Sequence, residues 1–403
     1  MANNRIFYAV QQVGLKPDGG DYHADAFRAL HGVQSVGMTT NFNLSQVFEL
    51  GQISIYENIE DIPDVEISMT KVLDGSPLIY HEATRTASSP TLSGRQNEKS
   101  IFALGIWPDT EDACTSGKQV ESQCECSGLF VSSIAYNFPL EDSFTEDITL
   151  VGNHKVWHAD SRIIAGGATV NAYGIPDADF VGAFTAAGAS PSGNGGVNRR
   201  EDLIFGPSGV AVAALGGNGV DSNGYHRDSD VSCLPNYIPG INTDGTNTKD
   251  SDGNFGAHIS NISCSTDLGR EEIFELGRKA PYHRFASFPT EVTCEIEITA
   301  TSGDLISATE EGILSGVGGD QCLSDSGNLS DATIRLATCE GTRIYLGKKN
   351  KLASVNYGGG DAGGGNATVT YSFTTFNDMT VMHINDQNPN FTWAARATHL
   401  APA

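Results

Sequence analysis

The sequence predicts a mainly β protein with two tandem β-sandwich domains and only short helices. Two observations indicate this fold: a motif that occurs twice, and a strand-like alternation of apolar and polar residues after each copy. A third is the composition, since 46 of the 403 residues are glycine and helical patterns are few. The apolar fraction of 39% supplies a packed core and is too high for a disordered chain.

The motif that occurs twice spans residues 47–63 and 273–289, which align without a gap. Six of the 17 positions are identical, and they include glycine, proline and aromatic residues, which fix backbone and core. We call the identical residues the repeat motif. They are Phe48, Glu49, Leu50, Gly51, Tyr56 and Pro63 in the first copy, and Phe274, Glu275, Leu276, Gly277, Tyr282 and Pro289 in the second.

Further matches follow each copy of the repeat motif in the same order. Each copy leads into an alternating, strand-like segment, Val65–Val72 in the first case and Val292–Ala300 in the second. A weaker match then pairs Ser133, Ile134 and Tyr136 with Ser354, Val355 and Tyr357, and Ile148 and Thr149 with Val369 and Thr370. Two matching blocks in one order indicate a tandem duplication of one β-rich domain.

The duplication divides the chain into three parts. We expect a first β domain over 1–165, a glycine-rich linker or insertion with long loops over 166–255, and a second β domain over 256–403. Short helices are expected at Leu44–Leu50 and Arg270–Leu276, each ended by a glycine in the left-handed conformation.

Charge limits the functions that fit this chain. The formal net charge is −25, which argues against a grip on nucleic acid because phosphate contacts need clustered lysine and arginine. It does not exclude a protein past which DNA slides. No membrane span is expected, and the first residues do not predict a signal peptide.

Catalytic and metal-binding motifs do not emerge from the sequence, so we expect no enzyme and no cofactor. No segment of the sequence matches the nucleophile elbow or the phosphate-binding loop at all of the positions that these motifs require. The best metal candidate is Asp250, Asp252 and Asn254, but Phe255 stands where a calcium loop needs glycine, and Asn261 where it needs glutamate. A solvated loop is the favoured interpretation, and ion binding there stays open. The eight cysteines are expected to be reduced thiols.

The repeat motif has two interpretations. In the first, its phenylalanines and leucines seal a short helix onto the sheet of each domain. In the second, it lies at subunit contacts, where Glu49 and Glu275 pair with basic residues such as Arg278 or Arg284. The two are compatible in an assembly, because loops that are costly in a monomer become interfaces.

The order of these segments resembles the tail tube (major tail) proteins of tailed bacteriophages. The resemblance lies in Phe-Glu-Leu-Gly, then a proline-led alternating strand that ends in a turn at Val72–Gly75, and later Val131–Tyr136 and Phe144–Leu150. It covers most of both repeats, whereas the glycine-rich middle departs from a minimal tube protein.

This resemblance implies a structural virion protein with no catalytic residue. Sheets of neighbouring subunits would join into a continuous barrel around an acidic channel, through which DNA passes without specific binding. Two domains per chain imply trimeric rings with pseudo-six-fold symmetry, stacked into a tube. The partners implied are other tail proteins, namely the terminator, the baseplate and, in a contractile tail, the sheath; the location is the virion tail, assembled in the host cytoplasm.

Two other functions remain open from the residues alone. A carbohydrate-binding or capsid-decorating β-sandwich virion protein would share the fold, but sugar binding needs an exposed aromatic platform, and the three tryptophans are widely separated. An enzyme would need convergent acid, base or metal residues. The sequence does not distinguish contractile from non-contractile tails, or trimeric from hexameric rings.

Overall fold

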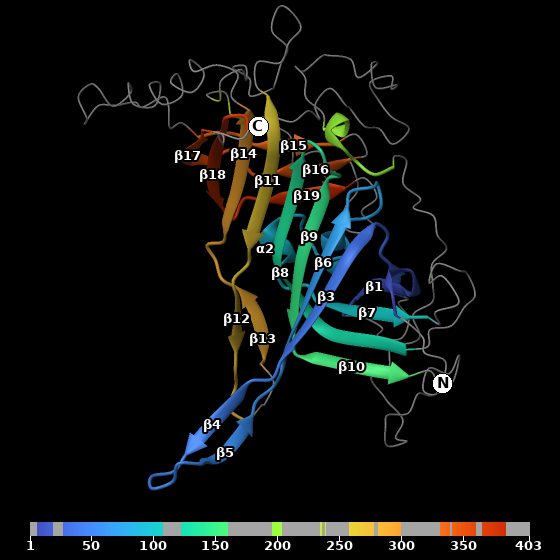
Figure 1. The fold of residues 1–403 in the computed structure, drawn as a ribbon, viewed down its shortest axis with the longest axis vertical. Coiled ribbons are helices and arrows are strands. Elements are labelled where there is room, and N and C mark those ends of the chain that lie inside the picture. Colours follow the sequence, from blue (N-terminus) through green and yellow to red (C-terminus); the bar gives the residue numbers. More distant parts are fainter. Residues whose placement is uncertain are drawn as a thin grey trace, which may run out of the picture.

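The computed structural model confirms a mainly β protein (Figure 1). It describes residues 6–18, 27–107, 122–159, 196–203, 234–235, 238, 258–277, 281–299, 331–338, 341–359 and 365–383. The helices in these residues are short: η1 (Tyr8–Val10), α1 (Ile79–Ala83), α2 (Leu92–Arg95) and η3 (Arg200–Asp202). None of them has the length and apolar character needed to cross a membrane.

Strands make up most of the described chain. Before residue 160 they are β1 (Gln11–Pro17), β2 (Arg28–Ala29), β3 (Val33–Asn41), β4 (Leu44–Phe48), β5 (Ile55–Glu60), β6 (Asp64–Val72), β7 (Ser100–Ile106), β8 (Ser122–Pro139), β9 (Thr145–Gly152) and β10 (His154–Ala159). After residue 257 they are β11 (Ile259–Asp267), β12 (Arg270–Ile273), β13 (His283–Ala286), β14 (Glu291–Thr299), β15 (Arg335–Ala337), β16 (Thr342–Tyr345), β17 (Lys351–Gly358), β18 (Thr368–Phe376) and β19 (Thr380–His383).

The centre of the fold is β8, a strand of 18 residues that changes partners along its length. Its first part pairs with β7 and β10, and its second part pairs with β9 and β11. The second part therefore belongs to an antiparallel sheet in the order β3-β6-β9-β8-β11-β14-β18-β17, which we call the main sheet. Figure 1 shows β11 beside β8, where the strands before residue 160 meet those after residue 257.

The main sheet consists of two four-stranded halves with one plan. The first half is β3-β6-β9-β8 and the second is β11-β14-β18-β17. In each half the first strand leads into a hairpin, β4–β5 or β12–β13, and then into the second strand. The last strand has an irregularity at the corresponding place in each half, between Val131 and Ser133 in β8 and between Leu352 and Ser354 in β17. β17 therefore corresponds to β8, and β3 to β11.

Strand pairing tests the weaker of the sequence matches. Ile134 lies opposite Ile148, and its predicted counterpart Val355 lies opposite Tyr371. The match of Ile134 with Val355 therefore fits the sheet, while Ile148 corresponds to Tyr371 and its predicted match with Val369 is wrong by two residues. A slip of two keeps every side chain on its own face, so the apolar pattern cannot reveal it.

The predicted helices at Leu44–Leu50 and Arg270–Leu276 are wrong, because both segments begin β-hairpins. Antiparallel partners, β5 and β13, take their backbone hydrogen bonds instead of a helical turn. The glycines do adopt the predicted left-handed backbone, with φ of +97° at Gly51 and +87° at Gly277, but they shape hairpin ends. The predicted strands are confirmed as β6 and β14, with Ala300 outside the described residues.

A second layer covers one face of the main sheet and encloses the core. β7, β1 and β2 continue from the first part of β8, and β15-β16-β19 form a separate sheet in the second half. One apolar cluster runs through both halves, and Tyr136, Ile262, Ile296 and Phe373 are among its fully buried members. The inward positions of the main sheet alternate with polar outward positions, as a half-covered antiparallel sheet requires.

The segment that follows β6 is held under the sheet by Glu146. The Glu146 carboxylate accepts hydrogen bonds from the backbone N–H groups of Ile79 and Tyr80, at 2.7 and 3.1 Å, and from the Tyr136 hydroxyl at 3.0 Å. Burial raises the pKa of Glu146, against the opposing effect of these donors. Ile79, Tyr80 and His81 belong to α1. The His81 ring nitrogen Nε2 lies 3.0 Å from the Val381 carbonyl oxygen in β19, so α1 also links the two halves.

Replacing Tyr136 with phenylalanine is expected to destabilise the fold by about 1–2 kcal/mol, because a buried carboxylate loses a hydroxyl donor. The measurement is the free energy of unfolding in denaturant. Because Glu146 already has a raised pKa in the folded state, its contribution to stability declines as pH rises above the unfolded value of about 4.3. Tyr136→Phe removes a donor that lowers this pKa, so the variant should lose more stability as pH rises.

Tyr357→Phe is the matched control, since Tyr357 occupies the corresponding position of β17 and is 54% exposed. It should leave the free energy of unfolding within about 0.5 kcal/mol of the original. Equal effects of the two substitutions would contradict the role given to the Glu146 carboxylate.

Candidate assembly surfaces

The main sheet ends in two edges, β3 on one side and β17 on the other (Figure 1). Among the described strands, β3 pairs only with β6 and β17 pairs only with β18. Each edge therefore presents a row of backbone N–H and C=O groups on its outer side. Such edges pair readily with further strands unless something covers or disrupts them.

The pairing of β8 with β11 shows how these two edges can be covered. It runs from Asn261 opposite Pro139 to Asp267 opposite Ser133, and it joins the last strand of the first half to the first strand of the second. We call this pairing the internal junction. Because β17 corresponds to β8 and β3 to β11, the two free edges are the counterparts of the two strands that pair at the internal junction.

Corresponding side chains are buried at the internal junction and exposed at the free edges. Tyr136 in β8 is fully buried, whereas its counterpart Tyr357 in β17 is 54% exposed. Leu268, which follows β11, is 2% exposed, whereas its counterpart Phe42, which follows β3, is 67% exposed. Side chains that a neighbouring strand buries at the internal junction are therefore exposed at their corresponding positions on the free edges.

The second hairpin, β12–β13, lies over the ends of strands in the first half. Arg284 donates to Asp64 at 2.7 Å and to the Asn153 side chain at 3.2 Å, and it also pairs with Glu272. Arg270 donates to the Val131 carbonyl oxygen at 2.7 Å. These charged contacts fix the hairpin against the internal junction.

Additional contacts of the same hairpin involve rings. The His283 ring packs edge-on against Phe130, with centroids 4.9 Å apart, and the Arg270 guanidinium lies 5.2 Å from the centre of the same ring. Burial and the nearby cations Lys99 and Arg270 lower the pKa of His283, which keeps the ring neutral near pH 7. The uncharged imidazole packs on Phe130 without a desolvation cost for an ion.

The Phe-Glu-Leu-Gly part of the repeat motif lies at the far ends of both hairpins, and the exposed Tyr56 and Tyr282 lie on their returning arms. Leu50 and Leu276 are fully exposed, and Phe48 and Phe274 are more than half exposed. Pro63 and Pro289 lie at the return of each hairpin to the main sheet. These positions contradict the interpretation that the motif seals a helix onto the sheet, because neither the helix nor the burial is present.

The predicted pairing of the motif glutamates with basic residues at subunit contacts is not tested by a single chain, which shows only contacts within itself. Glu49 accepts a hydrogen bond from the Gln52 side chain at 3.0 Å within its own hairpin. Arg284 pairs with Asp64 and Glu272 instead of Glu275. Arg278 lies outside the described residues, so the proposed contact with it is not placed.

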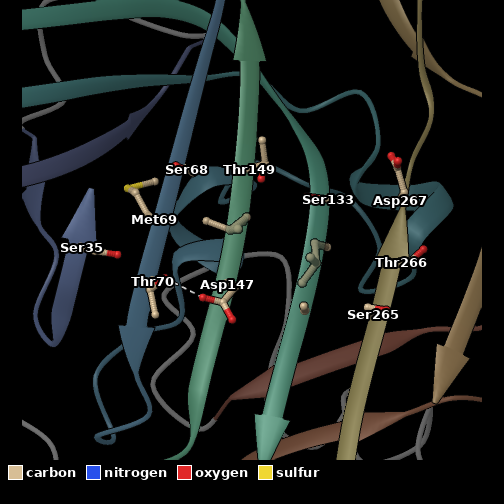
Figure 2. Close-up of a pocket in the computed structure, with 13 residues that line it drawn as sticks. Ser35, Ser68, Met69, Thr70, Ser133, Asp147, Thr149, Ser265, Thr266 and Asp267 are labelled. Carbon is tan, nitrogen blue, oxygen red and sulfur yellow. Dashed lines mark hydrogen bonds between the residues drawn. The ribbon is translucent and has the colours of Figure 1, made fainter. Parts of the chain in front are cut away.

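The face of the main sheet opposite the second layer is polar and acidic. Figure 2 shows part of it, a hollow of about 370 Å³ that strands of both halves line mainly with serine and threonine. Within it the Thr70 hydroxyl donates to Asp147 at 2.6 Å. The acidic residues at outward positions of the eight strands are Asp64, Glu66, Asp147, Asp267, Glu291, Glu295 and Glu297, and Arg284 pairs with the first of them. Of the lysines and arginines on these strands as described, Lys351 is outward and Lys71 is buried.

From the sequence we expected an acidic channel wall but did not assign it to residues, although the signal for this acidic face was present. The segment Glu-Val-Thr-Cys-Glu-Ile-Glu-Ile-Thr already places its glutamates on one side by the period of two. The residues that line the hollow in Figure 2 include no aromatic ring, so it offers no stacking platform for a sugar. Trp107 is buried, Trp157 is exposed on β10, and Trp393 lies outside the described residues.

Metal-binding groups are equally absent from the part of the chain that the structure describes, where no three His, Cys, Asp or Glu side chains gather. Asp250, Asp252 and Asn254 lie outside it, so the calcium question is not addressed. Cys124, Cys126, Cys264 and Cys294 are buried free thiols, as expected. The other four cysteines lie outside the described residues.

Comparison with known proteins places tail components among the similar structures. The chain matches no family model and no curated protein. The sheath–tube complex of an extracellular contractile injection system is 12% identical, with a TM-score of 0.29 over 39% of this chain and 94% of the other. The tube-terminating cap of the anti-feeding prophage is 14% identical, with a TM-score of 0.28 over 40% of this chain and 94% of the other. The tail of an empty gene transfer agent particle is 12% identical, with a TM-score of 0.25 over 37% and 95%.

Arg284→Ala is expected to release the β12–β13 hairpin from the first half. Loss of the charged hydrogen bonds to Asp64 and Asn153 should cost about 2–3 kcal/mol of stability and raise hydrogen exchange in the hairpin. The control is Asn58→Ala at the corresponding position of β4–β5, which should change stability by less than about 0.5 kcal/mol. Unchanged exchange in the Arg284 variant would contradict the anchoring role.

Proposed function

We propose that this chain is a structural virion protein that assembles with copies of itself into stacked rings and forms the tail tube of a phage-like particle. The observation that carries the proposal is the pairing of β8 with β11 inside the chain. It supplies, within one molecule, a template for the contact that β17 of one copy makes with β3 of the next.

The internal junction also specifies the register of that contact. Tyr136 lies opposite Cys264, and Ile134 opposite Thr266. The corresponding pairs are Tyr357 with Met38 of the next copy, and Val355 with Thr40 of the next copy. Both edges direct apolar side chains inward, since Val36, Met38, Leu352 and Val355 pack against the core while remaining partly exposed. Joining the edges would bury these side chains and pair the free backbone groups.

A contact between two different edges is heterologous, so it propagates from copy to copy until the rotation closes a ring. Each chain contributes two similar halves and therefore two similar steps around the ring. Three copies give six halves, which is the pseudo-six-fold ring expected from the duplication. The exposed hairpin ends with Phe48, Leu50, Phe274 and Leu276 supply apolar surface for contacts with an adjacent ring or with other tail proteins.

The acidic face of the main sheet becomes the channel wall in this proposal. The second layer occupies the other face, so closure of the sheet with that layer outside directs Glu66, Asp147, Glu295 and Glu297 to the lumen. Carboxylates repel the phosphates of DNA, and small hydroxyl side chains present little surface for base stacking. DNA would therefore pass without specific binding.

Met38→Lys and Tyr357→Glu are each expected to block ring assembly while leaving the monomer folded. Each buries an unpaired charge at the proposed junction, yet each position is already partly exposed in the single chain. Electron microscopy and light scattering measure assembly, and circular dichroism measures folding. Thr39→Lys is the matched control, since it lies beside Met38 but points to the opposite face.

Mixing adds a sharper test of the edge contact. Tyr357→Glu retains an intact β3 edge, so a minor fraction of it should cap the β17 edge of unmodified copies and shorten or open their assemblies. Assembly of both variants at the concentration that suffices for the unmodified chain would refute the proposed pairing.

Glu295→Lys with Glu297→Lys is expected to make assembled tubes retain DNA. The substitutions replace two carboxylates per chain on the channel wall with cations, which bind phosphate with a steep dependence on salt. Retention is measured by filter binding of short DNA duplexes between low and moderate salt. Glu201→Lys, on η3 outside the main sheet, is the control for a charge reversal away from the channel wall. Tubes of the double variant that retain no more DNA than unmodified tubes would refute the assignment of this face to the lumen.

A further inference from the structure

We infer that the first hairpin, β4–β5, seats over the second half of the neighbouring copy whose β17 pairs with its β3, where Glu57 faces Lys351 of that neighbour. The inference rests on the proposed self-assembly, and it names a lateral contact that edge pairing alone does not require. The occupant of the second-half surface is a second copy of this chain.

The precedent is the seat of β12–β13 on the first half. That hairpin leaves β11 at the internal junction and crosses the ends of β8, β9 and β6, where it contacts Phe130, Asn153 and Asp64. In the single chain β4–β5 has no equivalent seat among the described residues, and every position in both of its strands is exposed. Both hairpins have the same spacing, with Leu44 opposite Glu60 and Arg270 opposite Ala286.

Correspondence of the two halves identifies the surface on which β4–β5 would lie. Phe130 lies opposite Val151, and Lys351 lies opposite Thr374. These are corresponding positions in the two halves of the main sheet. Lys351 therefore takes the place of Phe130, and Phe376 takes the place of Asn153. Phe376 is 55% exposed, so the second half offers an uncovered aromatic ring beside an exposed lysine.

The hairpin residues complement that surface. Glu57 takes the place of His283, so the contact between the His283 and Phe130 rings inside the chain becomes a carboxylate facing the ammonium group of Lys351. Leu44 takes the place of Arg270, which lies over the Phe130 ring, and is exposed in the single chain, so it is available to cover the alkyl part of Lys351. Lys351 already pairs with Asp331 at 2.8 Å, and both side chains are about half exposed. The carboxylate of Glu57 would approach the Lys351 ammonium group from its exposed side.

Charge also distinguishes the two seats. On the first half, Arg284 of the hairpin meets Asp64, so the hairpin supplies the cation. On the second half, the hairpin supplies the anion at Glu57, and Asn58 replaces the arginine. Glu291 takes the place of Asp64 on the second half, so both seats hold a carboxylate there, and Lys351 in the place of Phe130 is the charge that distinguishes the second half.

Cysteine cross-linking tests the geometry of this seat. In assembled protein, Glu57→Cys with Lys351→Cys is expected to form a ladder of covalently linked chains with a short bis-maleimide, whereas each single variant should not. Glu49→Cys with Lys351→Cys is the matched control, because Glu49 lies at the far end of the same hairpin. Assembled tubes that give no ladder with the first pair would overturn the inference and leave the proposed function standing.

Charge reversal tests the energetics. Glu57→Lys and Lys351→Glu are each expected to raise the concentration needed for half-assembly about threefold to fivefold, as for a partly exposed ion pair made repulsive. The double variant should return to within about twofold of the unmodified chain. Failure of the double variant to recover, with the single variants impaired, would overturn the pairing. An unmodified chain that forms no rings at all would overturn both the inference and the proposed function.

Discussion

The constraint on which this structure depends is that every backbone group along a strand needs a hydrogen-bonding partner. Inside the chain, β8 has partners on both sides along its length. Its first part pairs with β7 and β10, and its second part pairs with β9 and β11. Gly128 has φ of +67° at the change of partners, and its N–H donates to Asp18 at 2.9 Å. The rest of β8 can then pair with β9 and with β11, and the two halves become one sheet. Among the described strands, β3 and β17 have no partner on their outer sides, and the proposed ring would supply one to each.

Much of the fold follows from local patterns that the sequence shows. Period-two alternation predicted β6 and β14, and left-handed glycines were expected at Gly51 and Gly277. The same glycines suggested helix ends, because a glycine in this conformation closes helices and hairpins alike. Only the pairing of β4 with β5 decides between them, and a single segment does not contain that information.

The candidate surfaces depend on contacts between residues far apart in the sequence. Tyr357 was recognised as the counterpart of Tyr136, but one is exposed and the other buried because of which strand lies beside it. The pairing of β8 with β11 spans more than a hundred residues, and periodicity carries no trace of it. The acidic face was readable in the glutamates of β14, whereas its continuation across both halves required the strand order.

Covalent linkage of the two halves changes the thermodynamics of building a ring. The internal junction forms at an effective concentration set by the chain itself, so its translational entropy is not lost again when copies associate. In the proposed ring, every second junction is therefore complete before assembly begins. Linkage also frees the two junctions to evolve separately. An arginine fastens the hairpin seat inside the chain, and in the proposed ring a glutamate fastens the other, a divergence that six identical single-domain subunits could not sustain.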